Sequence, residues 1–168
     1  MKKILLPHTA IDDVMITSSV NIIGKKLTLT FTVKGSLENY IFPKEQLIKR
    51  ANELWKASCF ELFLENSKSE GYYELNFSAS LAWNFYYLEY YRAKVQEVEL
   101  TTEPTIQIRE NKNSYGIELI LEGYDFEIFD SCNLTAILLT EKDKRTFWSI
   151  QPMEDIPDFH NRCYFINL

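Results

Sequence analysis

Residues 54–92 carry the sequence LWKASCFELFLENSKSEGYYELNFSASLAWNFYYLEYYR. This stretch holds two of the three Trp residues of the chain and a dense run of Phe and Tyr, with acidic and amide side chains at alternating positions. Alternation with a period of two is typical of β-strands. We therefore expect consecutive strands that present polar groups within an aromatic face.

A β-hairpin is predicted inside this stretch. Residues 58–65 and 72–78 both alternate, and the segment between them, NSKSEG, has the composition of a turn. Antiparallel pairing of these strands would bring Glu61 close to Glu74 and Asn76 on one face of the sheet.

Alternating segments also occupy much of the remaining chain. They are residues 1–6, 14–23, 26–34, 105–110, 114–121, 133–140, 146–150 and 163–168. Residues 83–91 are aromatic on both sides, so we expect a loop, a partner chain or a ligand to cover the polar face of that strand. Only residues 44–55, KEQLIKRANELW, have the composition for a turn or two of helix. About ten short strands with regular turn signals predict an all-β fold: one domain over residues 1–168, a two-sheet antiparallel β-sandwich of jelly-roll or immunoglobulin-like type with little helix.

The composition restricts the partner and the compartment. The chain has 168 residues, and 18 Lys and Arg against 24 Asp and Glu give a net charge of −6. Scattered positive residues on an acidic chain argue against nucleic acid as a partner. The three Cys residues have no metal-like spacing, and the N-terminal segment has no secretory apolar region. No stretch is long and apolar enough to span a membrane. These features predict a cytoplasmic protein with reduced thiols and no membrane partner.

Two blocks of residues stand out for their order and spacing. The first comprises Arg50, Leu54, Trp55, Cys59-Phe60-Glu61, Phe63, Tyr73, Leu75-Asn76-Phe77-Ser78, Trp83, Tyr86 and Tyr91-Arg92. The second comprises Pro157-Asp158-Phe159-His160 and then Phe165. Together they resemble the DOMON-like domains, which are related to the ninth family of carbohydrate-binding modules. The chain departs from that pattern at residues 78–81, where SASL replaces the usual Ser-Pro-Ser-Gly turn.

The resemblance implies a jelly-roll-like β-sandwich whose relatives bind sugars or haem. On the candidate face, Glu61, Glu74 and Asn76 would hydrogen-bond a polyol. Trp55 or Trp83, the latter expected to be half exposed, would stack on the apolar side of a sugar ring. These residues form the predicted ligand site.

Other roles for the same face stay open. Arg92 is expected to pair with Glu61 or Glu74, a structural role more than a contact with ligand. The alternating polar residues also fit an ordinary solvated sheet face. Glu61 and Glu74 could form the carboxylate pair of a glycosidase, but nothing in their spacing selects for hydrolysis.

Nucleophile, metal and haem sites are weakly supported. Cys59 or Cys163 with His160 could imitate a nucleophile and its base, but we expect buried, inert thiols in apolar strands. Asp158, His160 and Cys163 provide too few ligands for a zinc site, and we expect a structural role for them. The haem ligands available to the chain are His8, His160, Met15 and Met153. No His–Met pairing stands out among them, so we predict no cofactor and no metal.

Two functions follow from these observations. The chain is either a non-catalytic module that binds a saccharide or a similar small polar ligand, or an interaction domain whose aromatic face binds a protein partner. A concave site with converging Trp and carboxylates would indicate the first, and a flatter, more apolar surface the second. Phe159 is expected to be a core anchor in either case.

Overall fold

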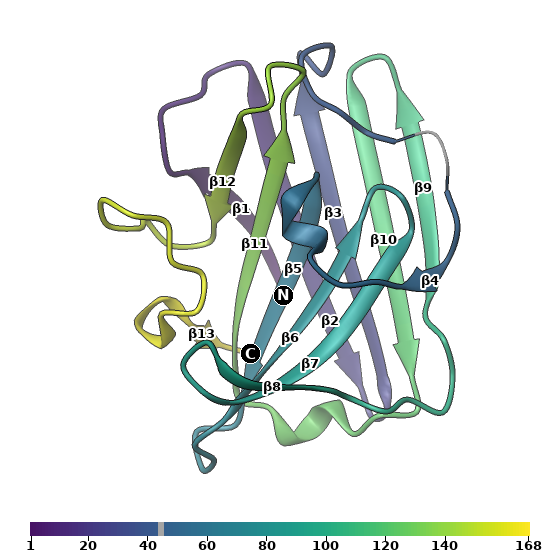
Figure 1. Cartoon of the computed structure of the whole chain (residues 1–168), viewed down its shortest axis with the longest axis vertical. Helices are drawn as coiled ribbons and strands as arrows, with labels where there is room; N and C mark the ends of the chain where they lie inside the picture. The colour runs from purple at the N-terminus through teal and green to yellow at the C-terminus, as the bar shows by residue number, and fades with distance from the viewer. Residues whose placement is uncertain (44–45) are drawn as a thin grey trace.

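A computed structural model describes residues 1–43 and 46–168 (Figure 1). The strands are β1 (Lys2–Pro7), β2 (Val14–Ile23), β3 (Lys26–Gly35), β4 (Lys49–Arg50), β5 (Cys59–Glu65), β6 (Tyr72–Ser78), β7 (Ala82–Tyr90), β8 (Ala93–Glu97), β9 (Thr105–Asn111), β10 (Ser114–Glu122), β11 (Ser131–Leu139), β12 (Arg145–Ser149) and β13 (Ile166–Asn167). Three short 3-10 turns are η1 (Leu54–Lys56), η2 (Phe126–Ile128) and η3 (Arg162–Tyr164). The described part of the chain contains no α-helix, which confirms the predicted all-β class.

The strands form one continuous sheet in the order β4-β7-β6-β5-β11-β12-β1-β2-β3-β10-β9, with β13 paired to β11 and β8 to β7. All pairs are antiparallel except β4 with β7, which is parallel. β1 links two halves: residues Lys2 to Leu5 pair with β2, and Leu6 and Pro7 pair with β12. We call β2, β3, β9 and β10 the first arm, and β4 to β8 with β11 and β12 the second arm.

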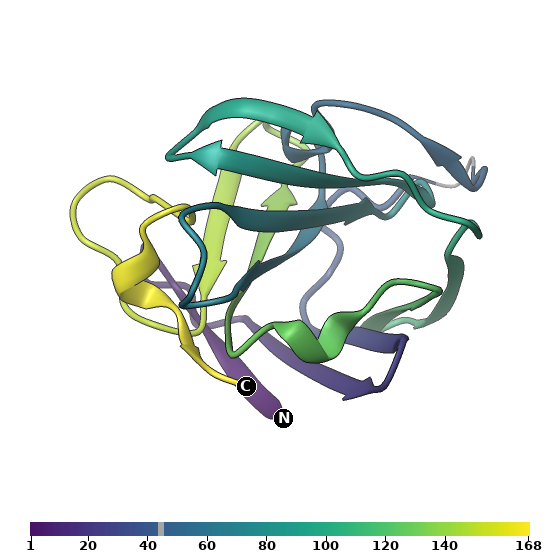
Figure 2. The same cartoon turned by 90° about the horizontal axis from the view of Figure 1, so that it is seen from below.

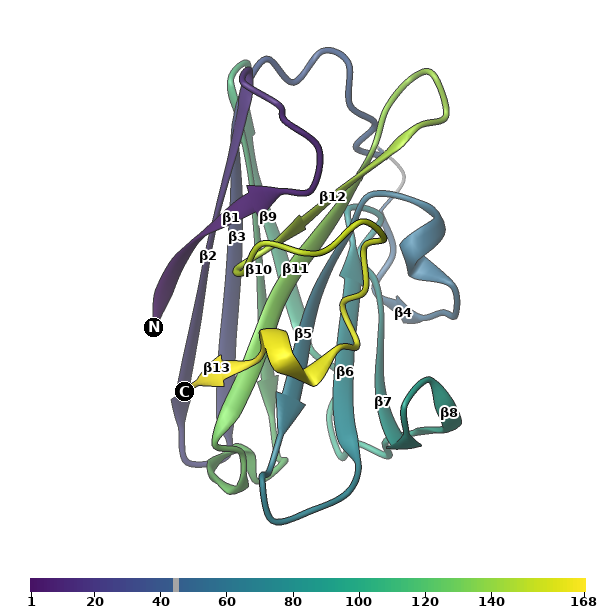
Figure 3. The same cartoon turned by 90° about the vertical axis from the view of Figure 1, so that its left-hand side faces the viewer.

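The sheet curls so that the two arms lie opposite each other (Figures 2 and 3). Their facing sides enclose the main core, which follows from the alternation along each strand. On β3, every second side chain from Leu27 to Val33 is buried. Phe31 of β3 packs against Phe60 of β5 across the gap, with ring centroids 5.1 Å apart. Aromatic pairs of this kind fix how the arms are spaced.

The predicted two-sheet sandwich is not confirmed, although the opposed arms are compatible with it: β1 continues the ladder from one arm to the other, so the strands form a single curled sheet. One feature of the predicted fold needs correction. The helix expected over residues 44–55 does not form over residues 46–55: β4 lies there instead, and η1 begins at Leu54. The reason is a backbone bond, since the Ala51 N–H donates to the Trp83 carbonyl at 3.0 Å and holds this segment along β7. Lys44 and Glu45 lie outside the described residues.

The turn at residues 78–81 closes without the Pro and Gly of the Ser-Pro-Ser-Gly turn in the domains that the sequence resembles. The Leu81 N–H donates to the Ser78 carbonyl at 3.0 Å, and Leu81 adopts a φ of 64°, in the left-handed region that favours glycine. The turn is therefore formed in spite of its sequence.

No helix in the described residues is long and apolar enough to cross a bilayer.

Candidate functional site

A row of polar side chains crosses the outer face of the second arm. Thr135 on β11, Glu61 on β5, Asn76 on β6 and Asn84 on β7 are direct neighbours in register. This confirms the predicted pairing of Glu61 and Asn76 on one face. All four are buried, although they point away from the core between the arms. Buried polar groups need partners, so this face differs from an ordinary solvated one.

η1 and residues 157–160 cover this face and leave a cleft between them. One hollow of about 330 Å³ is lined by Trp55, Glu61, Glu74, Arg92, Ile137, Arg145, Phe147, Pro157, Phe159 and His160. A second, of about 300 Å³, shares four of these residues and adds Glu53, Asn76, Tyr86, Leu88 and Val95. We call the two hollows together the cleft. Its walls come from η1 on one side and from residues 157–160 on the other, so four of the predicted site residues besides Trp55 meet here: Glu61, Glu74, Asn76 and Arg92.

The two carboxyl groups at the floor are unusual in having little positive charge beside them. Thr135 donates its hydroxyl to Glu61 Oε2 at 3.0 Å, and the Asn76 side chain donates to Glu74 Oε1 at 2.7 Å. Burial raises the pKa of both groups, and repulsion by Glu74 raises the pKa of Glu61 further. In the described part of the chain, no Lys or Arg nitrogen lies within 4.0 Å of either carboxyl.

The middle of the polar row has an acceptor without a partner. Asn84 closes one end of the row, because its side-chain amide is fully engaged. Its oxygen accepts a hydrogen bond from Arg50, and its nitrogen donates to Asn52 and Glu97. Asn76 is 3% exposed, and its Oδ1 atom has no hydrogen bond among the described residues. A buried acceptor left unpaired costs about 1–3 kcal/mol. The floor of the cleft is therefore incomplete without a donor from elsewhere.

A hydrogen-bonded chain fixes one wall of the cleft. The Tyr72 hydroxyl accepts the Arg92 backbone N–H at 3.1 Å and lies 2.7 Å from His160 Nδ1. Burial and the Arg92 charge lower the pKa of His160 to about 4, so the ring is neutral. Both contacts are satisfied when Tyr72 donates to Nδ1, which leaves the Nε2–H of His160 facing Glu74 Oε2 at 4.0 Å.

Arg92 contacts the C-terminal segment, by which we mean residues 157–162, and not the carboxyl groups of the floor. Its guanidinium pairs with Asp158 at 2.8 Å, and the Tyr91 hydroxyl donates to the same carboxylate at 2.9 Å. The expected pair with Glu61 or Glu74 is thus wrong. The backbone of Arg92 has a φ of 52°, in the left-handed region, between β7 and β8, and its side chain reaches Asp158.

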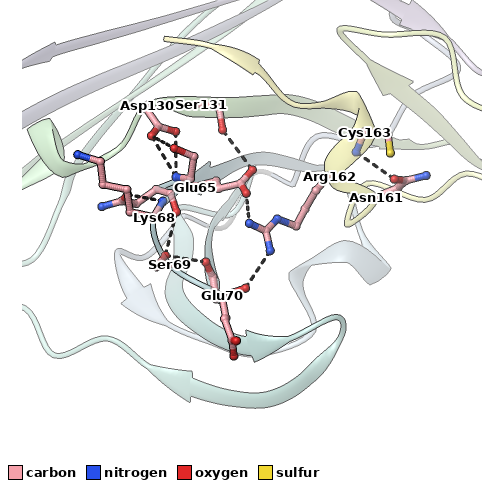
Figure 4. Close-up of polar contacts among 12 residues, drawn as sticks. Glu65, Lys68, Ser69, Glu70, Asp130, Ser131, Asn161, Arg162 and Cys163 are labelled. Atoms are coloured by element: carbon pink, nitrogen blue, oxygen red, sulfur yellow. Dashed lines mark hydrogen bonds and ion pairs between the residues drawn. The ribbon is translucent and has the colours of Figure 1, made fainter.

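The C-terminal segment has a second anchor at the end of β5 (Figure 4). Arg162 reaches from η3 to the carboxylate of Glu65 and donates to the Glu70 carbonyl at 2.8 Å. Asn161 accepts the Cys163 N–H at 3.0 Å and begins the η3 turn. With Arg92 at one end and Arg162 at the other, the segment carries Phe159 and His160 into the cleft wall.

Trp55 forms the opposite wall. Its indole is 42% exposed, and the charged groups of Lys56 and Arg145 lie 5.7 and 5.3 Å from its ring centroid. An exposed indole beside buried polar groups is a platform for the apolar side of a ligand.

Comparison with known proteins adds the fold to this geometry. No protein-family model matches the sequence, and no curated protein does. A proposed carbohydrate-binding protein from Bacteroides uniformis ATCC 8492 is similar with a TM-score of 0.63 and 12% identity, over 90% of this chain and 76% of the other. A family 9 carbohydrate-binding module from Caldicellulosiruptor kristjanssonii, in complex with cellotriose, has a TM-score of 0.55 and 10% identity, over 99% and 77%. The fold is similar to carbohydrate-binding proteins.

Trp83 does not belong to the cleft. It is 1% exposed and lies in the core between the arms, with the Arg50 guanidinium 4.4 Å from its ring centroid. The expectation of a half-exposed Trp83 is wrong because Asn84, and not Trp83, shares the outer face with Asn76. The cover expected over this strand is a loop, since the Tyr86 hydroxyl donates to Asn52 at 2.6 Å.

Several residues of the site were missed from the sequence. Thr135 and Arg145 lie far from residues 54–92 in the sequence. Asn84 lies within that stretch but had no assigned role. Only the pairing of the strands brings the three residues to this face. His160 was weighed as a base or a metal ligand, and its place is the cleft wall. The pairing of β5 with β11 could not be predicted, because their paired residues are 66 or more positions apart in the sequence.

The cysteines and acidic residues show no second site. Cys59 and Cys132 are buried and burial raises the pKa of both thiols, whereas Cys163 is exposed in η3, contrary to its expected place in an apolar strand. All three are free thiols. Among residues 1–43 and 46–168, no group of three His, Cys, Asp or Glu side chains could hold a metal ion. Phe159 is buried, as expected for a core anchor.

Proposed function

We propose that this chain is a non-catalytic module that binds a saccharide in the cleft of the second arm. The observation that carries the proposal is the incomplete floor: the unpaired Asn76 Oδ1 lies beside the buried Glu61 and the partly buried Glu74, in a cleft that the exposed Trp55 also lines. A polyol supplies hydroxyl donors to such a floor, and its ring offers an apolar side to the indole. The concave shape favours a small ligand over a protein partner.

Sequence and fold support the same assignment independently. The DOMON-like blocks place Trp55, Glu61 and Asn76 in the family pattern, and the similar structures carry names of carbohydrate-binding proteins. We assign no catalytic residue, because both carboxyls are engaged by the sheet, Glu61 with Thr135 and Glu74 with Asn76. We further propose a cytoplasmic location, which the three free thiols support.

The test is a glycan screen read by Trp fluorescence. Trp55 is the exposed indole of the three, so a bound sugar should change its emission, and Trp55→Ala should weaken binding by about tenfold or more with little effect on folding. Tyr90→Ala is the matched control, since Tyr90 is 47% exposed and lies outside the cleft lining. Equal loss in both variants, or no response to any glycan, would overturn the proposal.

A further inference from the structure

The floor of the cleft has more hydrogen-bond acceptors than donors. On Glu61, the Thr135 hydroxyl engages one oxygen, and the neighbouring Cys59 thiol is only a weak donor. On Glu74, Asn76 engages Oε1, and Oε2 has only the distant His160 ring. Asn76 Oδ1 has no partner in the described residues. Apart from the proton that the raised pKa leaves on Glu61 at neutral pH, three acceptor groups on two adjacent strands therefore lack donors.

These acceptors lie close to one another. Glu61 is directly opposite Asn76, and Glu74 is two residues from Asn76 on the same strand and face. Side chains at such positions start about 4.5–8 Å apart. Glu74 lines both hollows, Glu61 lines one and Asn76 the other, so one small group at the junction faces all three side chains. Reaching Asn76 Oδ1 takes a rotation of that side chain, because the atom itself is buried.

The positive groups of the cleft are occupied elsewhere. The Arg92 guanidinium is paired with Asp158, Arg145 lies over the Trp55 ring, and the buried His160 is neutral. Neither arginine contacts Glu61 or Glu74 within 4.0 Å, and the neutral His160 ring reaches Glu74 Oε2 only at 4.0 Å. The adjacent carboxyls of Glu61, which is buried, and Glu74, which is 13% exposed, have no Lys or Arg contact among the described residues, and the raised pKa of Glu61, about 8, keeps a proton on the pair at neutral pH. A cationic group that enters between them can take the place of that proton. Isolated buried charge is costly, so a positive ligand group is favoured there.

We propose that the saccharide bound in this cleft carries a protonated primary amine, which enters between Glu61, Glu74 and Asn76. This inference rests on the proposed function and names the ligand class. An ammonium group brings three N–H donors and no acceptor, which matches the three unsatisfied groups. A neutral hydroxyl brings one donor and an oxygen that itself seeks a donor. An acidic sugar would meet repulsion from the negative charge of the carboxyl pair.

The experiment compares sugars that differ in one group. Cellotriose, the trisaccharide of 2-amino glucose and its N-acetylated form share one backbone, and glucose, galactose and their 2-amino and N-acetyl forms repeat the comparison in monosaccharides. We expect the amino sugars to bind about tenfold more tightly than both relatives by calorimetry at neutral pH. The preference should shrink as salt is raised to about 0.5 M, because a contact between charges is screened.

Matched variants locate the preference. Glu74→Gln keeps the size and an acceptor but removes the charge, and should abolish the preference for the amine, measured as the ratio of the affinities for the amino sugar and its neutral relative. Glu118→Gln, the same change on the outer face of the first arm, should retain the preference. If Glu74→Gln does not fold, the salt dependence of the unmodified protein decides in its place.

The outcomes separate the two proposals. Neutral and amino sugars that bind equally, or an amine preference that survives both salt and Glu74→Gln, would overturn this inference and leave the saccharide module standing. No binding of any sugar would overturn the proposed function itself.

Discussion

The two arms present outer faces that look alike in sequence and differ in structure. β3 in the first arm alternates Leu and Phe with Thr, and its outer Thr28, Thr30 and Thr32 are half-buried. β5 in the second arm is buried on both sides from Cys59 to Leu64. The difference is the cover: η1 and the C-terminal segment line the hollow of about 330 Å³ on the second arm, whereas the strands themselves line the hollow of about 230 Å³ around Gly116 on the first. Alternation thus predicts which side chains share a face, and the cover decides whether that face becomes a site.

The largest expected effect comes from removing the anchor of that cover. Phe159 is 7% exposed and packs against Phe147, and its carbonyl accepts a bond from the Asn133 side chain at 3.2 Å. Phe159→Ala should lower the free energy of unfolding by about 3–5 kcal/mol, measured by urea denaturation, as truncation of buried Phe does. A loss below about 1 kcal/mol would show that the cover is held without it.

A smaller effect on the free energy of unfolding is expected from the titration of Glu61 and Glu74, which lie beneath the cover. The pKa of Glu61 and of Glu74 is raised in the folded state, so these groups bind extra protons when folded and stability falls as pH rises. The lowered pKa of His160, about 4 against an ordinary 6.5, acts in the opposite direction but only below pH 6.5. Between pH 6.5 and about 8 the carboxyl effect remains alone, and unfolding should become easier by about 1–2 kcal/mol.

The control for this pH effect is Glu61→Gln. The variant keeps the volume of the side chain and its contact with Thr135 but cannot ionise, so its stability should be flatter across the same interval. A profile as steep as that of the unmodified protein would remove Glu61 as the source.

The smallest effect belongs to the uncovered face. Glu118 lies on β10 in the first arm, half-buried, with a long contact of 3.4 Å to Thr30. Glu118→Gln should change stability by less than about 0.5 kcal/mol, because its one side-chain contact is long and partly open to solvent. A change as large as that of Glu61→Gln would mean that the two faces do not differ.

The fold was largely predictable, and the site only in part. The alternating segments predicted β2 and β6 with the bounds that they have, and the 58–78 hairpin placed Glu61, Glu74 and Asn76 together. Trp83 was misplaced because both sides of its strand are aromatic, so periodicity alone does not say which side faces the core. The cover and the partner of Arg92 depend on contacts between residues more than 60 positions apart, which local patterns do not encode.

The most direct test follows two side-chain amides by NMR as sugar is added. Asn76 lies at the floor of the cleft, and Gln107 lines the groove of the first arm, so the two amides report on the two faces. Cellotriose and its amino counterpart should shift the signals of Asn76 and of the Trp55 indole N–H, and leave Gln107 unchanged. Shifts at Gln107 without shifts at Asn76 and Trp55 would contradict the account.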